Sequence, residues 1–527
     1  MAGPLCFALS DAPAPDRALL GGKGAGLVEM SGLGLPVPPA FIIGTPCGHA
    51  YLAQGALPAQ LHDELGAQLE ALEKASGLGF GDDDRPMLVS VRSGAPVSMP
   101  GMMDTVLNVG LTERNLAALG RDTGDEGFAH SCFERLLESF ATTVRGISRG
   151  VVEEALLDLD AGAGAQERCA ALLGLIEAES GSPLPDAKGQ VTEAIEAVFR
   201  SWNSRRAIAY RKHKGISDEM GTAVVVQLMV FGNRGSNSGS GVAFTRDPST
   251  GEPGAFGDFL FSAQGEDVVA GERDALPLEV IGERLPDLQA ELERVFALLE
   301  RDTRDLCEVE FTIEEGTLWV LQTRPGQRSG RAAVRVAVAL ADDGLISREE
   351  ALERVTPEQL EAARAPVFGT EPSAEAILAQ GLAASPGAVV GEVALDPERA
   401  VAMNEEGRTV ILMRPTTSPV DLPGVIAAAG VVTGRGGRTS HAAVVARGMG
   451  RPAVCGVGDL VLSEDRRSAS LDAVEIAEGD LVSVDGDRGL VATGALPLSP
   501  AEDDPILARY LSWLDNAPSK ETHAHQS

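Results

Sequence analysis

The sequence predicts a multidomain α+β fold, and three observations lead to that class. A chain of 527 residues has room for about two to four domains, and 44% of its residues are hydrophobic, which is ample for cores. Blocks with strand-like patterns flank a long block with a helix-like pattern. A charged, proline-interrupted stretch at about 336–375 then precedes a second group of short strands.

The charge balance limits the partners. The 77 acidic and 44 basic side chains give a formal net charge of −33, so the surface repels nucleic acid and anionic membranes, and we expect neither as a partner. An anion such as ATP could still bind where cations and backbone N–H groups gather locally.

The cysteines and the apolar runs indicate a compartment. The six cysteines lack metal-site spacing, and no apolar run approaches the roughly 18 residues of a membrane span. The start of the chain has no basic segment followed by a long apolar one. We therefore expect free thiols and a cytoplasmic protein.

The first third should combine a glycine turn, a strand and helices. The turn at 21–24 leads into a helical pattern that ends before the prolines at 36 and 38. A buried strand at 87–92 runs into a loop at 98–104. Between about 113 and 212, apolar side chains recur at three- and four-residue spacing, which indicates an inserted block of helices.

The next blocks predict a mixed α+β region. The expected strands are 222–230, 242–245, 307–313 and 317–322. A glycine-rich loop at 232–241 joins the first two, and the Glu-Glu-Gly turn at 314–316 joins the last two in a hairpin. The stretch at 336–375 fits a helical linker rather than a core.

A second compact unit is expected at 376–498, with short strands, glycine turns and one small-residue helix near His441. The tail should form a weak helix with a loose end, where His523 and His525 are solvated rather than bound to metal.

His441 follows the glycine loop 434–438 and lies where a histidine could carry a phosphoryl group. A helix start offers unpaired N–H groups and the positive end of the dipole, which favour an anion and keep an attacking ring nitrogen neutral. The alternative is a polar residue beside a helix cap formed by Ser440 or Thr439. The segment alone leaves both interpretations open.

The predicted hairpin could bind Mg²⁺. Its first strand alternates, so Glu308 and Glu310 share one face while the intervening apolar side chains enter the core. If the strands pair through the short turn, Gln322 and Arg324 lie roughly opposite, giving oxygen ligands beside a phosphate-binding guanidinium. The solvated face of an edge hairpin with a surface ion pair fits the pattern equally well.

Two further segments could contact phosphate. The glycines at 232–241 would let the backbone approach a polyphosphate, although an ordinary flexible loop also fits, and no G-x-x-x-x-G-K-[ST] pattern occurs there or at 21–24. Lys23 and Arg92 lie where a turn and a strand end could present them to phosphate. A solvated surface position is the default alternative for both.

Taken together, segments across almost the whole chain resemble the pyruvate, phosphate dikinase family. The resembling segments are 21–27, 34–39, 90–94, 98–105, 238–248, 263–271, 310–313, 321–324 and 439–450. The stretch at 98–105 is similar to the dikinase that uses inorganic phosphate, rather than to phosphoenolpyruvate synthase, rifampicin phosphotransferase or glucan, water dikinase.

The resemblance implies four segments: an ATP-grasp domain at 1–335 with the helical insertion, a linker at 336–375, a swivelling β/β/α phosphohistidine domain at 376–498 and a tail at 499–527. It implies ATP-binding residues Lys23, Arg92, Ser238, Gly239, Ser240, Gly241, Glu310, Gln322 and Arg324. Glu310 and Gln322 would also hold Mg²⁺. Thr439 matches the position at which plant members are switched off by phosphorylation, and whether that regulation operates here is left open.

The resemblance also implies a reaction. His441 would take the β-phosphoryl group of ATP while the γ-phosphoryl group goes to inorganic phosphate, releasing AMP and pyrophosphate. The family's pyruvate-binding barrel needs about 250 residues, and only a short tail follows residue 498. We therefore expect phosphoenolpyruvate formation only with a separate barrel subunit, and leave the oligomeric state open, a homodimer included.

Two other hypotheses are kept from the sequence. The first is a nucleotide-binding regulatory protein without turnover, and the second is a phosphotransferase that acts on a different small acceptor. Ser240 and Glu308 stand where the family usually has threonine and aspartate, and either change could shift the affinity for nucleotide.

Overall fold

The chain forms two compact units in the computed structural model. The first contains residues 1–238 and 312–322, and the second contains 239–311 and 323–527. The structure describes residues 3–10, 12, 14–97, 99, 103–159, 163–270, 275–365, 367–368, 372–373, 376–438, 440–463, 465–471, 474–499 and 504–516. The predicted multidomain α+β class is confirmed, and in these residues no helix is long and apolar enough to cross a membrane.

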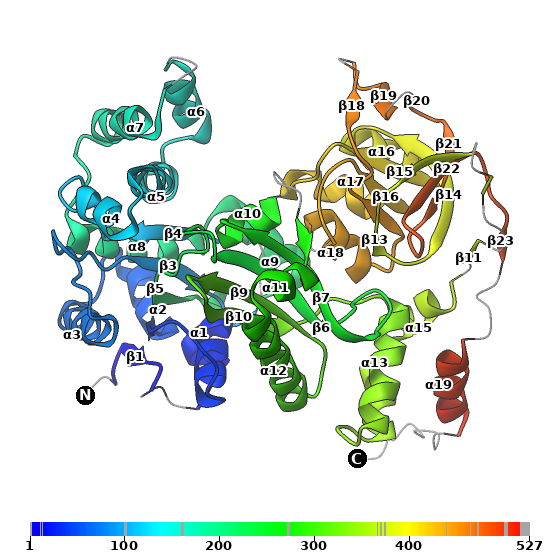
Figure 1. Ribbon diagram of the computed structural model, residues 1–527, viewed down its shortest axis with the longest axis horizontal. Coiled ribbons are helices and arrows are strands. Elements are labelled where there is room, and N and C mark those ends of the chain that lie inside the picture. Colours follow the sequence, from blue (N-terminus) through cyan, green and yellow to red (C-terminus); the bar gives the residue numbers. More distant parts are fainter. Residues whose placement is uncertain are drawn as a thin grey trace. The chain divides into compact units, whose positions relative to one another are not determined.

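The first unit is built on an antiparallel sheet with the order β1-β2-β5-β3-β4 (Figure 1). Its strands are β1 (Cys6–Ala8), β2 (Ala40–Ile43), β3 (Val89–Gly94), β4 (Thr105–Val109) and β5 (Ala223–Leu228). Valines dominate β5, as expected for a buried strand. The strands predicted at 87–92 and 222–230 are confirmed, with ends that differ by one or two residues.

Helices cover this sheet, and the helical block predicted at 113–212 is confirmed. The helices and short helical turns are α1 (Arg17–Gly32), α2 (Thr45–Gln54), α3 (Ala59–Ser76), α4 (Leu116–Thr123), α5 (Glu126–Ser139), the π-helical η1 (Phe140–Val144), α6 (Arg149–Leu157), α7 (Ala165–Ser180), α8 (Ala187–Ser201), α9 (Arg205–Lys214) and the 3₁₀ turn η2 (Asp218–Met220). The helix expected after the turn at 21–24 begins earlier, because Asp16 caps α1 and the helix passes through a kink at Gly21.

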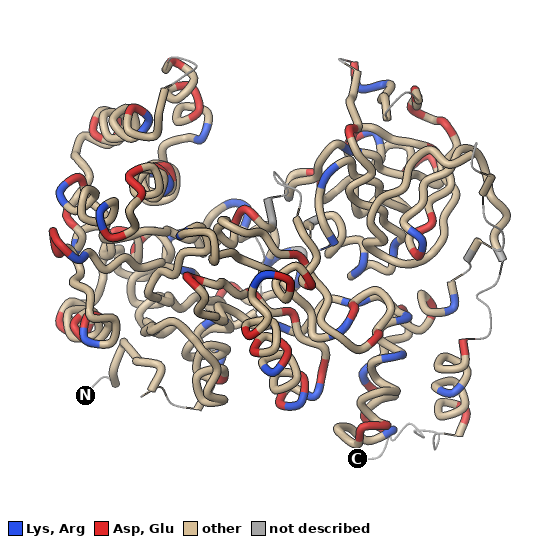
Figure 2. The backbone as a smooth tube through the Cα atoms, in the orientation of Figure 1, with Lys and Arg blue, Asp and Glu red and all other residues tan. Residues whose placement is uncertain are grey.

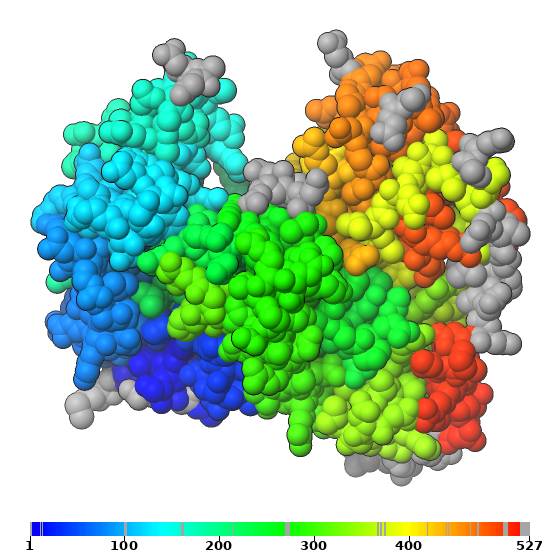
Figure 3. Space-filling model, in the orientation of Figure 1, coloured from blue at the N-terminus to red at the C-terminus, as the bar shows by residue number. Residues whose placement is uncertain are grey.

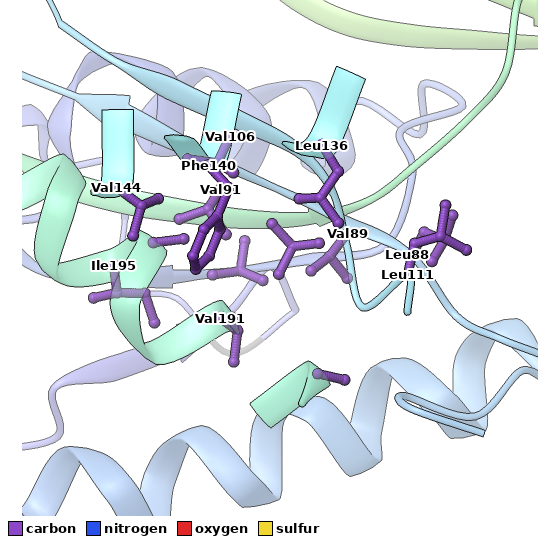
Figure 4. Packing of buried hydrophobic residues seen from close by; sticks show 14 of the residues in the cluster. Leu88, Val89, Val91, Val106, Leu111, Leu136, Phe140, Val144, Val191 and Ile195 are labelled. Carbon is purple, nitrogen blue, oxygen red and sulfur yellow. The ribbon is translucent and has the colours of Figure 1, made fainter. Parts of the chain in front are cut away.

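The core of the first unit lies between β3, β4 and the helices α5 and α8 (Figure 4). Leu136, Phe140 and Ile195 project from the helical side toward Val91 and Val106, and all five side chains are fully buried. Burying each such side chain contributes about 1.5–3 kcal/mol. The sheet that carries Arg92 is therefore held in place by the helices packed on one of its faces.

The second unit contains a sheet with the order β10-β9-β6-β7-β8. Its strands and associated helices are β6 (Gly239–Arg246), β7 (Pro253–Phe261), β8 (Leu276–Pro277), β9 (Cys307–Glu314), β10 (Thr317–Pro325), α10 (Gly265–Ala270), α11 (Glu279–Arg284) and α12 (Pro286–Thr303). The predicted hairpin is confirmed, since Glu315 and Gly316 form its turn with positive φ angles of 46° and 81°.

The stretch expected to be a linker begins inside a buried helix. The helices here are α13 (Gly330–Asp342), α14 (Arg348–Arg354), α15 (Pro357–Ala363) and α19 (Pro505–Asp515). Val336, Ala337 and Leu340 are buried together with Tyr510 of α19, so this part is a small core, contrary to the expectation. Figure 3 shows α19 packed beside α13, where Arg509 donates two hydrogen bonds to Asp342.

The region from 376 to 499, called here the C-terminal sheet region, has a mixed sheet with the order β12-β22-β21-β14-β15-β16-β17-β13. Its strands are β12 (Ile377–Gln380), β13 (Leu382–Ser385), β14 (Ala388–Ala394), β15 (Val410–Arg414), β16 (Gly430–Thr433), β17 (Ala453–Cys455), β21 (Leu481–Asp485) and β22 (Leu490–Thr493). The strands from β14 to β17 are parallel.

Two layers cover this sheet. One consists of α16 (Pro397–Glu405), η3 (Pro419–Asp421), α17 (Leu422–Ala427) and α18 (His441–Gly448), and the other of β18 (Leu460–Leu462), β19 (Ser468–Leu471) and β20 (Val474–Ala477). Val410 and Leu412 face the helices while Ile411 and Met413 face the small sheet. The predicted β/β/α layering is confirmed, and a short pair, β11 (Val367–Phe368) with β23 (Leu498–Ser499), flanks the region.

Candidate active site

The glycine turn of the first unit lies against the end of β3. Gly21 has a φ of 69°, and a Cβ there would come within 1.6 Å of the Gly94 carbonyl oxygen, so only glycine fits. The N–H of Gly22 donates to the Ala95 carbonyl oxygen at 2.9 Å. The turn that carries Lys23 and the strand that carries Arg92 are therefore neighbours, as a shared phosphate site requires.

Two glutamines orient Arg92 within the first unit. Its Nη1 donates to Oε1 of Gln227 and its Nη2 donates to Oε1 of Gln322, each at 3.4 Å. Gln322 was a candidate, whereas Gln227 was missed. A single amide inside the buried strand β5, where it is 2% exposed, is the signal that could have identified it.

Ser238 is buried, and its hydroxyl contacts protein. The Oγ atom donates to the Arg234 carbonyl oxygen and accepts from the N–H of Glu315 at 2.8 Å. Ser238 therefore ties the glycine-rich loop to the hairpin turn, and its predicted contact with phosphate stays a prediction.

Gly239, Ser240 and Gly241 lie in strand β6, so the prediction of a loop up to residue 241 was wrong. A Cβ at Gly239 would come within 2.2 Å of the Phe259 ring, and one at Gly241 within 2.4 Å of the Phe311 ring. The small residues that suggested a flexible loop are thus required because two aromatic rings pack against the strand. Ser240 is fully buried.

The predicted carboxylate pair lies on β9 in the second unit. Nη2 of Arg324 is 2.5 Å from Oε1 of Glu308 and 3.4 Å from Oε1 of Glu310. Burial alone would lower the pKa of Arg324, but the two carboxylates raise it above its ordinary value. Glu308 is 3% exposed, so the alternative of a solvated hairpin face is wrong for this residue.

The hairpin crosses between the two units. Its tip, 312–322, belongs to the first unit, and its base belongs to the second. Gln322 and Arg324 are two residues apart on β10, so their side chains leave the same side of one strand. The candidates of both units are thus linked through a single covalent element.

His441 begins helix α18, as predicted. Ser440 occupies the cap position, but its side chain makes no capping hydrogen bond, and its Oγ instead lies 3.8 Å from Sγ of Cys455. The cap interpretation is therefore not supported for Ser440. Thr439 and the side chain of His441 lie outside the described residues.

The loop before His441 packs on strand β7 of the same unit. A Cβ on Gly437 would come within 2.5 Å of Oδ2 of Asp258, so the glycine allows close approach. The guanidinium of Arg438 lies over the Phe256 ring, with a distance of 4.9 Å to the ring centroid. The histidine loop thus lies on the sheet that carries the carboxylate pair.

Arg447, which the sequence analysis missed, holds this arrangement from inside α18. It is fully buried and donates from Nη2 to the carbonyl oxygens of Ala384 and Arg438 at 2.5 and 2.9 Å, and from Nε to Oγ of Ser249 at 3.3 Å. Burial lowers its pKa to about 10, partly offset by carboxylates that include Glu308. An arginine inside an alanine- and valine-rich helix is the signal in the sequence.

The carboxylates of β9 suit a Mg²⁺ ion that is also bound by phosphate oxygens. In the described part of the chain, no group of three or more His, Cys, Asp or Glu side chains could hold a metal ion. Mg²⁺ commonly takes one or two carboxylates together with phosphate oxygens and water. Glu310, the more exposed of the two carboxylates, supplies such a hard oxygen donor beside a guanidinium, so it fits a metal that arrives with a nucleotide.

The charged residues are distributed unevenly. Figure 2 shows Asp and Glu along α3 and α12, together with basic residues, while the interior strands carry few charges.

The six cysteines are buried free thiols, as expected, and burial raises the pKa of each.

Comparisons with known proteins identify both halves of this arrangement. Residues 53–280 match the AMP/ATP-binding domain of pyruvate phosphate dikinase, and residues 407–489 match the mobile domain of PEP-utilising enzymes. The chain belongs to the pyruvate, phosphate dikinase family. The predicted resemblance is thereby confirmed.

Several curated relatives are similar to almost the whole of this chain. The pyruvate, phosphate dikinase of Rhizobium meliloti is 43% identical over 535 residues, a match that covers 96% of this chain and 59% of the relative. The Clostridium symbiosum enzyme is 40% identical, with coverages of 95% and 59%, and a chloroplastic enzyme of Arabidopsis thaliana is 43% identical, with coverages of 95% and 53%. The chain thus spans a little over half the length of these relatives.

Proposed function

We propose that this chain is an ATP- and phosphate-dependent histidine kinase of the dikinase type, with His441 as the phosphoryl carrier. A ring nitrogen of His441 forms a bond to the β-phosphorus, and the α–β bridging bond breaks to release AMP. The β–γ bridging bond also breaks, and the γ-phosphoryl group joins inorganic phosphate as pyrophosphate. In sum, ATP, phosphate and histidine give AMP, pyrophosphate and phosphohistidine.

The observation that carries this proposal is the position of the histidine loop within the second unit. Gly437 packs against Asp258, and Arg447 bonds to Ser249, so α18 begins at the sheet that presents Glu308 and Glu310. The start of α18, where the Ser440 side chain makes no capping hydrogen bond, offers N–H groups to a phosphoryl group.

The remaining candidates bind and orient ATP. Lys23, Arg92 and Arg324 offset the phosphate charge, and the segment at 238–241 lies over the phosphates. Glu310 and Gln322 would hold Mg²⁺, which when bound would neutralise charge on the transferring group. Because little covalent chemistry is required of these side chains, their task is positioning.

Isotope position tests this function. ATP labelled in the β-phosphoryl group should label the wild-type protein in an acid-labile, base-stable form, and His441→Ala should abolish the label. His62→Ala, which alters an exposed histidine on α3, is the matched control and should retain it. Label from the γ-position in place of the β-position would contradict the proposed step.

Two further arms separate the rival activities. Omitting inorganic phosphate should prevent the release of pyrophosphate, so that γ-label stays on the protein together with β-label, whereas a synthase-type reaction would be unaffected. Tight ATP binding without any phosphohistidine would instead support a regulatory protein.

The acceptor is proposed to be pyruvate, bound at a barrel outside these 527 residues. Labelled protein mixed with pyruvate alone should keep its phosphoryl group, and addition of such a barrel should release phosphoenolpyruvate. Discharge to another small acceptor without the barrel would favour a different phosphotransferase. A cytoplasmic location, a homodimer and regulation at Thr439 stay predictions.

A further inference from the structure

The glycine-rich loop of the first unit is fastened at both ends to the turn of the β9–β10 hairpin. At the start of the loop, the N–H of Phe231 donates to Oε1 of Glu314 at 3.2 Å. We use the name loop clamp for the contacts between segments 231–238 and 314–316. Both segments belong to the first unit.

The other end of the loop is held mainly by backbone. The N–H of Glu315 donates to Oγ of Ser238 at 2.8 Å, and the N–H of Gly316 donates to the Asn237 carbonyl oxygen at 3.2 Å. Neither bond involves a group that titrates near neutral pH. Of these three hydrogen bonds, the one from Phe231 to Glu314 is therefore the one whose acceptor is an ionisable side chain.

Glu314 faces one cation and two other carboxylates. Arg234, in the loop, lies 3.2 Å from both Asp122 of α4 and Glu315 of the turn. Arg234, Glu315 and Asp122 are the charged groups that act on Glu314, from the loop, the hairpin turn and α4. Arg234 is already shared by two carboxylates, so it compensates the charge of Glu314 incompletely.

The loop start is also fixed by apolar packing. Phe231 is 7% exposed and meets Phe128 of α5 edge to face, with ring centroids 5.3 Å apart. The Glu314 carboxyl group, which is half-buried, accepts a hydrogen bond from the backbone of this packed aromatic residue. Its hydrogen bond to Phe231 sets where the glycine-rich segment leaves the core.

We propose that Glu314 is a positioning residue for nucleotide binding, which holds the start of the glycine-rich loop so that the loop can cover the ATP phosphates. The inference rests on the function proposed above for the loop. Glu314 itself touches no phosphate in this account. It acts through Phe231 and the shape of the segment that follows.

The clamp should loosen as the pH rises. Burial raises the pKa of Glu314 from 4.5 to about 7, although the Phe231 N–H and Arg234 lower it. When the loop opens, the solvated carboxyl group returns to its ordinary pKa and releases a proton. Opening is therefore favoured by rising pH between these two values, and the opening equilibrium should increase about tenfold from pH 6 to pH 8.

Hydrogen exchange tests the clamp without any turnover. In the wild-type protein, the opening of amides at 231–238, corrected for intrinsic exchange, should rise about tenfold from pH 6 to pH 8. Glu314→Gln keeps an oxygen that can accept from Phe231 and should remove this rise. Glu315→Gln is the matched control, because its side chain is 58% exposed and also contacts Arg234, and it should retain the rise.

The rate of His441 phosphorylation tests the positioning role. Here KM is the ATP concentration that half-saturates this rate. Glu314→Ala should raise this KM about tenfold with a smaller change in the maximal rate, and Glu314→Gln should restore it. A lowered Tm with unchanged KM and loop exchange in Glu314→Ala would reduce Glu314 to a structural residue and overturn the proposal. An identical pH response in wild type and Glu314→Gln would overturn the titrating role.

The two proposals fail in different ways. If wild-type protein forms no phosphohistidine, the proposed function fails, while the exchange measurements still decide whether Glu314 holds the loop. If phosphorylation occurs but the Glu314 variants bind ATP normally, the function stands and the positioning role fails.

Discussion

The two cores behind the candidate site are built from side chains of different size. In the first unit, Phe133, Leu136 and Phe140 are among the large side chains that fill the space behind β3 and β4. Beneath α18 in the C-terminal sheet region, the corresponding layer includes Ala442, Ala443, Ala446 and other small residues. Large side chains stabilise a core by filling its volume. Alanines instead let the backbone of a helix lie close to the strands, which fixes the position of that helix.

The two cores also differ in the polar side chains that they bury. In the first unit, neutral amides satisfy the loop after β4: Gln190 accepts from the N–H of Gly110 at 2.9 Å and donates to the Leu111 carbonyl oxygen at 3.0 Å. In the C-terminal sheet region, the cation of Arg447 has the equivalent role. We infer that the first core supports a binding surface, while the second sets the position of one helix start.

The largest expected effect is the loss of a large side chain from the first core. Phe140→Ala should lower the free energy of unfolding by about 3–5 kcal/mol, because the cavity is enclosed by α8 and β3 and cannot collapse. Urea denaturation monitored by circular dichroism measures it. A cost below about 1 kcal/mol would show that the helices close over the gap and would remove the contrast between the cores.

Loss of a buried amide comes next. Gln190→Leu keeps the approximate volume but takes this hydrogen-bond partner from the N–H of Gly110 and from the carbonyl oxygens of Leu111 and Pro185, which should cost about 2–4 kcal/mol. The exposed Gln60 on α3, mutated in the same way, is the control and should change stability by less than about 0.5 kcal/mol. Equal costs at both positions would mean that water replaces the missing partner.

Several elements could be predicted because a local signal is strong. The hairpin at 307–325 combines alternating apolar residues with a turn that needs two positive φ angles, and it forms as expected. The pairing of Arg324 with Glu308 and Glu310 follows from strand alternation and a short turn alone. The start of α18 at His441 likewise follows from the glycine loop and the small residues after it.

Other features depend on contacts between distant segments, which no local pattern contains. Gly239 and Gly241 suggested a loop, but rings from β7 and β9 occupy the space that a side chain would need. The position of Gln227 beside Arg92 depends on the antiparallel pairing of β5 with β3. Arg447 could not be assigned a partner, since Ser249 lies 198 residues away in the sequence.

In the small-residue core, added volume should be the damaging change. Ala443→Leu should cost about 1–3 kcal/mol, because Ala443 is fully buried against the sheet and extra methylenes must displace α18. Its effect on phosphorylation of His441 should exceed its effect on stability. Ala290→Leu on the exposed face of α12 is the control and should be near neutral. Normal phosphorylation in Ala443→Leu would show that the helix position is not set by this layer.

The smallest effect on stability is expected at an exposed ion pair that belongs to neither core. Arg149 and Glu153 form an i,i+4 ion pair on α6, with side chains 87% and 61% exposed. Because water already solvates both groups, Glu153→Gln should change the free energy of unfolding by less than about 0.5 kcal/mol, with a smaller change still at high salt. Thermal denaturation at two salt concentrations measures this. A larger, salt-independent loss would mean that α6 contributes to the first core through its polar face, and the boundary of that core would then have to include it.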